Sequence, residues 1–92
     1  MNQAALYRVL EEGRCSIQMF EDHPGFFGNW RVHFTKAHDR FEIEADNREG
    51  WLSLWQRSND GTGKLLRQVP AAGEEGALTM LREWLPELED IK

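Results

Sequence analysis

Residues 41–57 read FEIEADNREGWLSLWQR, and this stretch decides the fold. It holds two runs of alternating character, 41–46 and 51–57, on either side of a segment rich in turn formers. Alternate side chains of a β-strand share a face, so each run places apolar side chains on one side of a sheet. The other side of the first run carries only acids, namely Glu42, Glu44 and Asp46. The sequence therefore predicts an antiparallel sheet with one decorated, acidic face.

The chain around this stretch extends the same pattern. Residues 15–21 alternate and stop at a turn signal, and residues 30–35 alternate before a short connection leads to the strand at 41. Residues 64–69 are a candidate fifth strand with an irregular pattern, which Pro70 ends. The strands follow one another closely, so we expect a meander of four or five strands.

Two amphipathic segments flank the strands. Residues 3–12 carry apolar side chains at helical spacing and are followed by Gly13, a natural stop. Residues 74–88 carry a leucine stripe and include Pro86, which we expect to end the helix early. Each stripe needs an apolar surface to bury against, so the fold class is α+β, with both helices packed on one face of the sheet. The sheet residues expected in the core are Cys15, Ile17, Met19, Trp30, Val32, Phe34, Phe41 and Ile43.

Length and charge limit the class of protein. A chain of 92 residues fits one domain, 1–92, and 40% hydrophobic residues are enough for a small core. The formal net charge is −5, from 16 acidic and 11 basic residues. This balance opposes nucleic-acid binding, because phosphate contacts need clustered Lys and Arg. We therefore expect a basic partner and no nucleic acid.

The sequence also predicts the cellular compartment of the protein. Cys15 is the only cysteine and cannot form an internal disulfide, and the first residues lack a basic segment followed by an apolar one. No apolar run approaches the roughly 20 residues needed to cross a bilayer. We expect a cytoplasmic protein with no membrane role.

The orientation of the strand at 51–57 has two interpretations. If its two leucines face the helices, Trp51 and Trp55 join the polar face, together with Arg31 and His33 from the strand at 30–35. If the tryptophans form the core, the leucines only cover the back. Ser53 favours the first interpretation, because the second would place it midway along the core side.

Phe26 and Phe27 lie in a loop flanked by glycines. In one interpretation, one of the two rings folds back as a lid over the core. In the other, the rings are an exposed contact, because large apolar side chains in a loop usually mark an interface.

The sequence contains only weak motifs for catalysis or metal binding. His33 and His38 lack a third metal ligand at a characteristic spacing, and Cys15 has no oxyanion loop beside it. Glu42 and Glu44 could pair for acid and base catalysis, but no apolar pocket surrounds them, so a solvated strand face is the simpler interpretation. The sequence therefore predicts no catalytic residue, no metal site, no cofactor and no enzymatic activity.

Two short segments carry a family resemblance. Gly28-Asn29-Trp30 opens one strand, and Asp46-Asn47-Arg48-Glu49-Gly50-Trp51 opens another. This arrangement resembles small immunity proteins of bacterial polymorphic toxin systems, some of which carry a Gly-Asp-Trp segment and later an Asp-Asn-Pro-Gly-Trp segment. The resemblance implies a cytosolic, antitoxin-like protein that binds one cognate toxin domain and blocks its active site or substrate surface.

We therefore expect an immunity protein that neutralises a basic toxin domain through its acidic, aromatic sheet face. The acids would steer the partner and the aromatic side chains would anchor it. The alternative is a small acidic secretion chaperone or adaptor, which would dimerise and hold an extended segment of an exported effector. The expected partner-binding residues are Trp51, Trp55, Glu42, Glu44, Asp46, Arg31, His33, Phe26 and Phe27.

Overall fold

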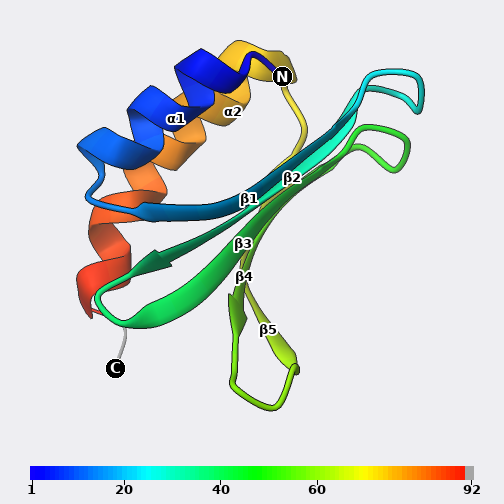
Figure 1. Ribbon diagram of the computed structural model, residues 1–92. Coiled ribbons are helices and arrows are strands. Elements are labelled where there is room, and N and C mark those ends of the chain that lie inside the picture. Colours follow the sequence, from blue (N-terminus) through cyan, green and yellow to red (C-terminus); the bar gives the residue numbers. More distant parts are fainter. Residues whose placement is uncertain (91–92) are drawn as a thin grey trace.

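The computed structural model describes the backbone of residues 1–90 and the side chains of residues 1–88. These residues form five strands, two α-helices and a terminal 3-10 helix (Figure 1). In chain order, the elements are α1 (Gln3–Glu12), β1 (Ser16–His23), β2 (Asn29–Lys36), β3 (Asp39–Asp46), β4 (Trp51–Arg57), β5 (Gly63–Pro70), α2 (Gly73–Trp84) and η1 (Leu85–Asp90).

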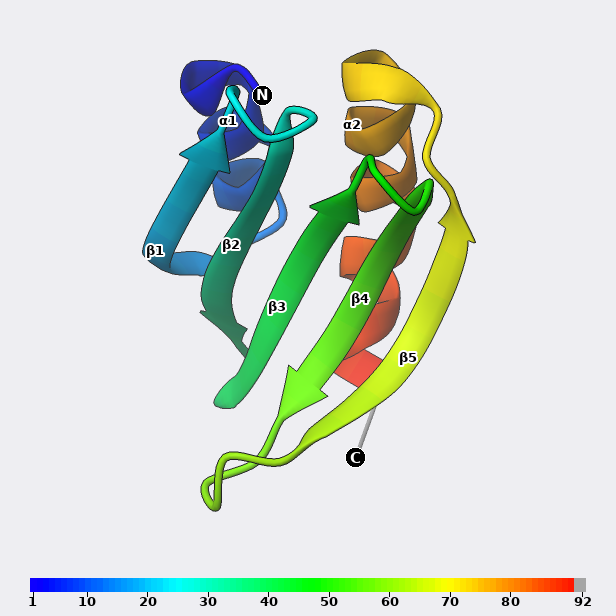
Figure 2. The ribbon, with the colours of Figure 1, turned by 90° about the vertical axis from the view of Figure 1, so that its right-hand side faces the viewer.

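The five strands form one antiparallel sheet in the order β1-β2-β3-β4-β5. Both helices lie on the same side of this sheet, as Figures 1 and 2 show. The predicted α+β meander is confirmed, and β5 shows that the fifth strand exists.

The core fills the space between the helices and the sheet. Phe34 and Phe41 stack across β2 and β3, with ring centroids 5.6 Å apart. The other fully buried large side chains come from both layers: Leu6, Leu10, Val32, Ile43, Leu54, Leu81, Leu85 and Leu88. Burial of these side chains is the main force that holds the layers together.

The edge strand β1 departs from the predicted alternation. Ile17 pairs with Phe34, but the next pair is Met19 with His33, so Gln18 is an extra residue in a β-bulge. The bulge turns Met19 to the polar side, where its side chain is 42% exposed, and Phe20 takes the inward place opposite Val32. The prediction that Met19 belongs to the core was therefore wrong.

The helix ends follow local chemistry. The side chain of Asn2 caps α1 by accepting a hydrogen bond from the Ala5 amide at 3.0 Å. The α-helical part of the last segment stops at Trp84, and the chain continues as a 3-10 helix that contains Pro86, as a proline without an N–H predicts. No helix within residues 1–90 is long and apolar enough to cross a bilayer.

Candidate partner-binding face

The side of the sheet opposite the helices is the candidate site, and we call it the open face. Figure 2 views the sheet from this side, with α1 and α2 behind it. Leu52 and Leu54 are buried beneath the sheet, so Trp51 and Trp55 point to the open face. Trp51 is 42% exposed, and Trp55 is half-buried. The first of the two interpretations for this strand is therefore the correct one.

Cross-strand pairing arranges the open face in rows. The middle row runs across all five strands as Met19, His33, Glu42, Trp55 and Leu65. The next row toward the β1–β2 loop consists of Glu21, Arg31, Glu44, Ser53 and Gln68. Side chains on adjacent strands of one row stand close enough to interact directly, so the environment of each side chain is set mainly by its neighbours in the row.

Glu42 lies buried at the centre of the open face. It is only 2% exposed, and its Oε1 accepts hydrogen bonds from Arg57 Nη2 at 2.8 Å and Nε at 3.2 Å. The ring of Trp55 lies beside this pair, 5.6 Å from the guanidinium carbon. The expectation of a solvated carboxylate was wrong here, because large neighbours cover Glu42 and Arg57 balances its charge.

His33 lies against the same carboxylate from β2. Its Nε2 lies 3.3 Å from Glu42 Oε1, which is an ion-pair distance when the ring is protonated. This nitrogen is buried and makes no hydrogen bond with the part of the chain that the structure describes. Glu42 is therefore enclosed between Arg57 and His33, and Arg57 balances its charge.

The row that contains Glu21, Arg31 and Glu44, with the residues between it and the β1–β2 loop, has a different balance of positive and negative charge. Glu21 Oε2 lies 3.3 Å from Arg31 Nε and 3.7 Å from His23 Nε2. Asp46 Oδ1 accepts a hydrogen bond from the Glu49 amide at 3.0 Å, which shapes the β3–β4 turn. The carboxylate of Glu44 forms no hydrogen bond or ion pair with residues 1–88. The available negative charge of the open face is thus at Glu44 and Asp46.

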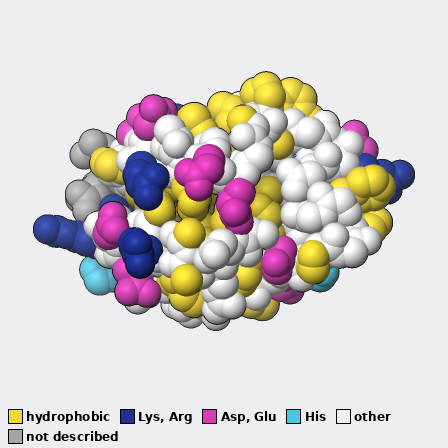
Figure 3. Space-filling view, turned by 90° about the horizontal axis from the view of Figure 1, so that it is seen from above, with side chains coloured by type: hydrophobic (Ala, Val, Ile, Leu, Met, Phe, Trp, Pro, Cys, Tyr) yellow, Lys and Arg dark blue, Asp and Glu magenta, His cyan; other side chains and the backbone are white. Residues whose placement is uncertain are grey.

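The loop between β1 and β2 presents both of its phenylalanines to solvent. Phe26 is 52% exposed and Phe27 is 59% exposed, and the rings meet edge to face with centroids 5.1 Å apart. The guanidinium of Arg48 lies 5.8 Å from the centre of the Phe27 ring. Figure 3 shows hydrophobic side chains beside a basic one at the right-hand end, where the two hairpin loops of Figure 1 project. The lid interpretation was therefore wrong.

Hydrogen bonds fix this loop against its neighbour. The Asn47 amide donates to Asn29 Oδ1 at 2.8 Å, and Asn47 Nδ2 donates to the Gly28 carbonyl at 2.9 Å. The β1–β2 loop and the β3–β4 turn therefore form one unit. The resemblance segments are both in this unit, since they contain Gly28, Asn29 and Asn47.

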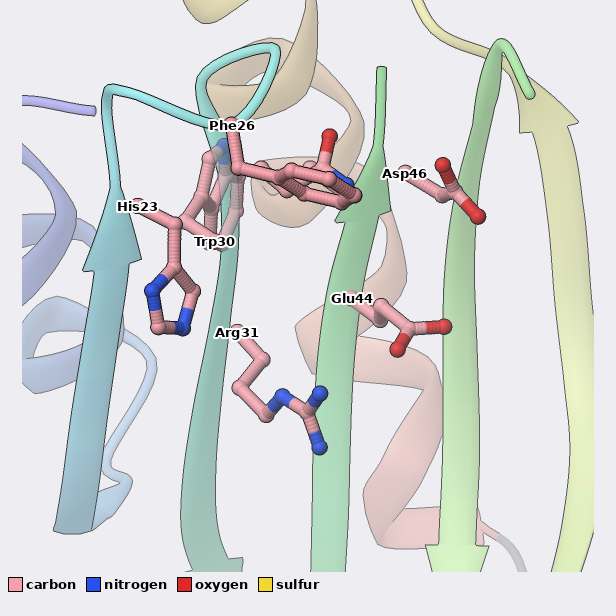
Figure 4. A pocket seen from close by; sticks show the side chains of 8 residues that line it. His23, Phe26, Trp30, Arg31, Glu44 and Asp46 are labelled. Atoms are coloured by element: carbon pink, nitrogen blue, oxygen red, sulfur yellow. The ribbon is translucent and has the colours of Figure 1, made fainter. Parts of the chain in front are cut away.

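A depression of about 280 Å³ lies between the phenylalanine loop and the sheet. Figure 4 shows Phe26 reaching from the loop toward β3 above Arg31, with His23 on the β1 side and the carboxylates of Glu44 and Asp46 on the β4 side. Its remaining lining residues are Asn29, Trp30 and Ala45. We call this site the Phe26 depression.

A second depression of about 480 Å³ lies toward the opposite end of the open face. Arg40 and Arg57 line it together with Glu42, and Arg40 Nη2 also donates to the Ser58 carbonyl at 3.1 Å. Its other lining residues are Gln18, Arg31, His33, Phe34, Phe41, Ser58 and Gly61. Arginines outnumber acids here, so the open face is acidic near Phe26 and basic near Arg40.

His33 and Glu42 are the titratable side chains that the sheet brings together on the open face, 3.3 Å apart. Among the described residues, no group of three or more His, Cys, Asp or Glu side chains could hold a metal ion. Burial raises the pKa of the Cys15 thiol to about 11, against a smaller opposing effect of Lys36. The thiol is therefore protonated at neutral pH, which does not suit a nucleophile.

Comparison with protein-family models, with curated proteins and with solved structures found no match. The open face is therefore interpreted from its own geometry and charge.

Proposed function

We propose that this chain is an immunity protein that binds a cognate bacterial toxin domain through the open face and neutralises it. The observation that carries this proposal is an uncovered sheet face that ends in three exposed large aromatic side chains, Trp51, Phe26 and Phe27. Exposed aromatic side chains are costly in water and are typical of the anchors that dominate protein interfaces. Coverage of this end by the toxin would remove that cost.

Charge defines the kind of toxin domain. The net charge of −5 attracts a basic protein at long range, and Glu44 and Asp46 place acid beside the aromatic anchors. Charges of this kind mainly increase the association rate and select the partner, whereas desolvated aromatic side chains supply most of the affinity. Glu42 has a supporting role in this proposal, because its charge is already balanced by Arg57.

The alternative proposal, a secretion chaperone that adds an extended segment to a sheet edge, has less support. The outer strand β5 carries Lys64 and Arg67, contains a bulge at Leu66 and ends at Pro70. β1, at the other edge, is also bulged. Charges, bulges and proline are the devices that prevent pairing at an exposed edge, so the open face is the better docking surface.

The test combines capture with inhibition. The wild-type protein is used to capture partners from the source organism, and the captured protein is identified and assayed for toxicity in cells with and without this chain. We expect one basic protein whose toxicity this chain abolishes. The variant Trp51→Ala with Glu44→Lys should lose both capture and protection.

The matched control is Glu83→Lys, which makes the same charge change on an exposed position of α2, away from the open face. Circular dichroism of each variant establishes that it is folded. Loss of protection in Glu83→Lys together with full protection by the open-face variant would contradict the proposal, as would a captured protein whose toxicity this chain does not affect.

A further inference from the structure

The geometry of the Phe26 depression points to its occupant, and we infer that it receives one arginine side chain from the partner protein. This inference rests on the proposed function, since it assigns a contact within the same interface. It concerns the part of the open face where uncompensated acid and an exposed ring are adjacent.

The first argument is charge. Glu44 and Asp46 lie two residues apart on β3, and both line the depression. Glu44 has no ion-pair partner within residues 1–88, and Asp46 Oδ1 is engaged only with the backbone of the turn. The positive lining residue Arg31 is already paired with Glu21 at 3.3 Å. The depression therefore has two carboxylates available for an incoming cation.

The second argument is the aromatic wall. The ring of Phe26 meets Phe27 edge to face and is 52% exposed, so about half of its surface remains accessible. A guanidinium over an aromatic face is attracted by the ring quadrupole. The neighbouring pair of Arg48 and Phe27, 5.8 Å apart, shows this contact within the same loop unit.

The third argument is the shape of the occupant. Arginine is planar, stacks on rings and donates hydrogen bonds in a fork that matches carboxylates, whereas lysine is a compact and strongly hydrated charge. The depression has a volume of about 280 Å³. A side-chain end fits this space without entry of the partner backbone.

The test uses a probe that needs no toxin. The full chain labelled with ¹⁵N is titrated at low salt with acetyl-arginine methylamide, and parallel titrations use the citrulline analogue, which has nearly the same shape without charge, and the lysine analogue. We expect saturable shifts at the amides of residues 26, 30 and 44–46 and at the Trp30 indole. Binding of the citrulline and lysine probes should be weaker by about tenfold and about threefold, respectively.

Two variants localise the effect. Glu44→Gln should weaken arginine binding about fivefold to tenfold, because it removes one charge-assisted contact, and Phe26→Leu should weaken it about threefold, because it removes the ring face. Glu83→Gln, the same change on α2, should leave it unchanged. Equal binding of arginine and citrulline, shifts spread over the acidic helix surfaces, or no saturable shift would overturn the inference.

Failure of this inference is distinguishable from failure of the proposed function. If a toxin is captured and neutralised but Glu44→Gln and Phe26→Leu leave arginine-probe binding and toxin affinity unchanged, the immunity function stands and the arginine site is wrong. If the arginine site binds its probe as expected but no toxin is neutralised, the site stands and the immunity function is wrong.

Discussion

The centre of the open face and the row next to it show how one sequence pattern gives two different environments. Glu42 and Glu44 are two residues apart on β3 and point the same way, yet one is buried and paired and the other is accessible and unpaired. The difference comes from their neighbours on β4. Glu42 stands opposite Trp55 with Arg57 beside it, whereas Glu44 stands opposite the small Ser53. The role of an acid on a sheet is therefore set by its cross-strand partners.

The largest effect on stability is expected when Arg57, the partner that distinguishes Glu42 from Glu44, is removed. Arg57→Met should lower the free energy of unfolding by about 2–4 kcal/mol, because it leaves the buried Glu42 carboxylate without its main cation. Urea denaturation followed by tryptophan fluorescence measures the change. The double variant Glu42→Leu with Arg57→Met should recover most of this loss, since no charge is then left in the site. A single variant as stable as wild type would show that the pair contributes nothing.

Substitution of Trp51 separates a residue needed for binding from one needed for folding. Trp51→Ala should weaken binding of the captured partner by about 2 kcal/mol or more, as expected for a central aromatic anchor, and should change the unfolding free energy much less. Isothermal titration calorimetry and urea denaturation separate the two effects. A large loss of stability with unchanged affinity would assign Trp51 to the fold.

The loop at the basic end gives a smaller effect that depends on pH. The Thr62 amide, with the Thr62 and Ser58 hydroxyls, donates hydrogen bonds to Asp60 and lowers the pKa of its carboxyl to about 2. Because the folded pKa lies below the ordinary 3.8, the stabilisation is present above pH 3.8 and is lost as the pH falls toward 2. Carbon-detected NMR titration should show this low midpoint. In Thr62→Val the midpoint should move back toward 3.8.

The smallest effect is expected for Glu44 itself. Glu44→Gln should change the unfolding free energy by no more than about 0.5 kcal/mol, because Glu44 has no partner among residues 1–88. The same substitution at Glu42 should destabilise clearly, since it weakens the contact with Arg57. Similar losses for both variants, measured by urea denaturation, would contradict the contrast.

The sequence was sufficient for the order of elements and for the orientation of β4. Regular alternation made β2 and β3 predictable, and the position of Ser53 indicated the correct face for Trp51 and Trp55. The bulge in β1 was missed, although the adjacent apolar residues Met19 and Phe20 break the alternation and could have signalled it.

The candidate site was predictable only as a set of residues. Alternation places Glu42, Glu44 and Asp46 on one face, and the meander places the strands beside them, but neither gives the register that decides which side chains cover each acid. The burial of Glu42 depends on Arg57 and His33, which are remote in sequence and meet it only through the register of the sheet. The Phe26 depression likewise joins a loop and a strand that the sequence does not place side by side.

The two hydrogen bonds from Asn47 have a consequence for the energetics of recognition. They hold the phenylalanine loop against the β3–β4 turn before any partner arrives. A loop that is already ordered loses less conformational entropy when it is covered, so more of the contact energy remains as affinity. Preorganisation of this kind typically lengthens the lifetime of a complex by slowing its dissociation. In the proposed complex, Asn47 would therefore lengthen the residence time of the toxin by holding the loop in place.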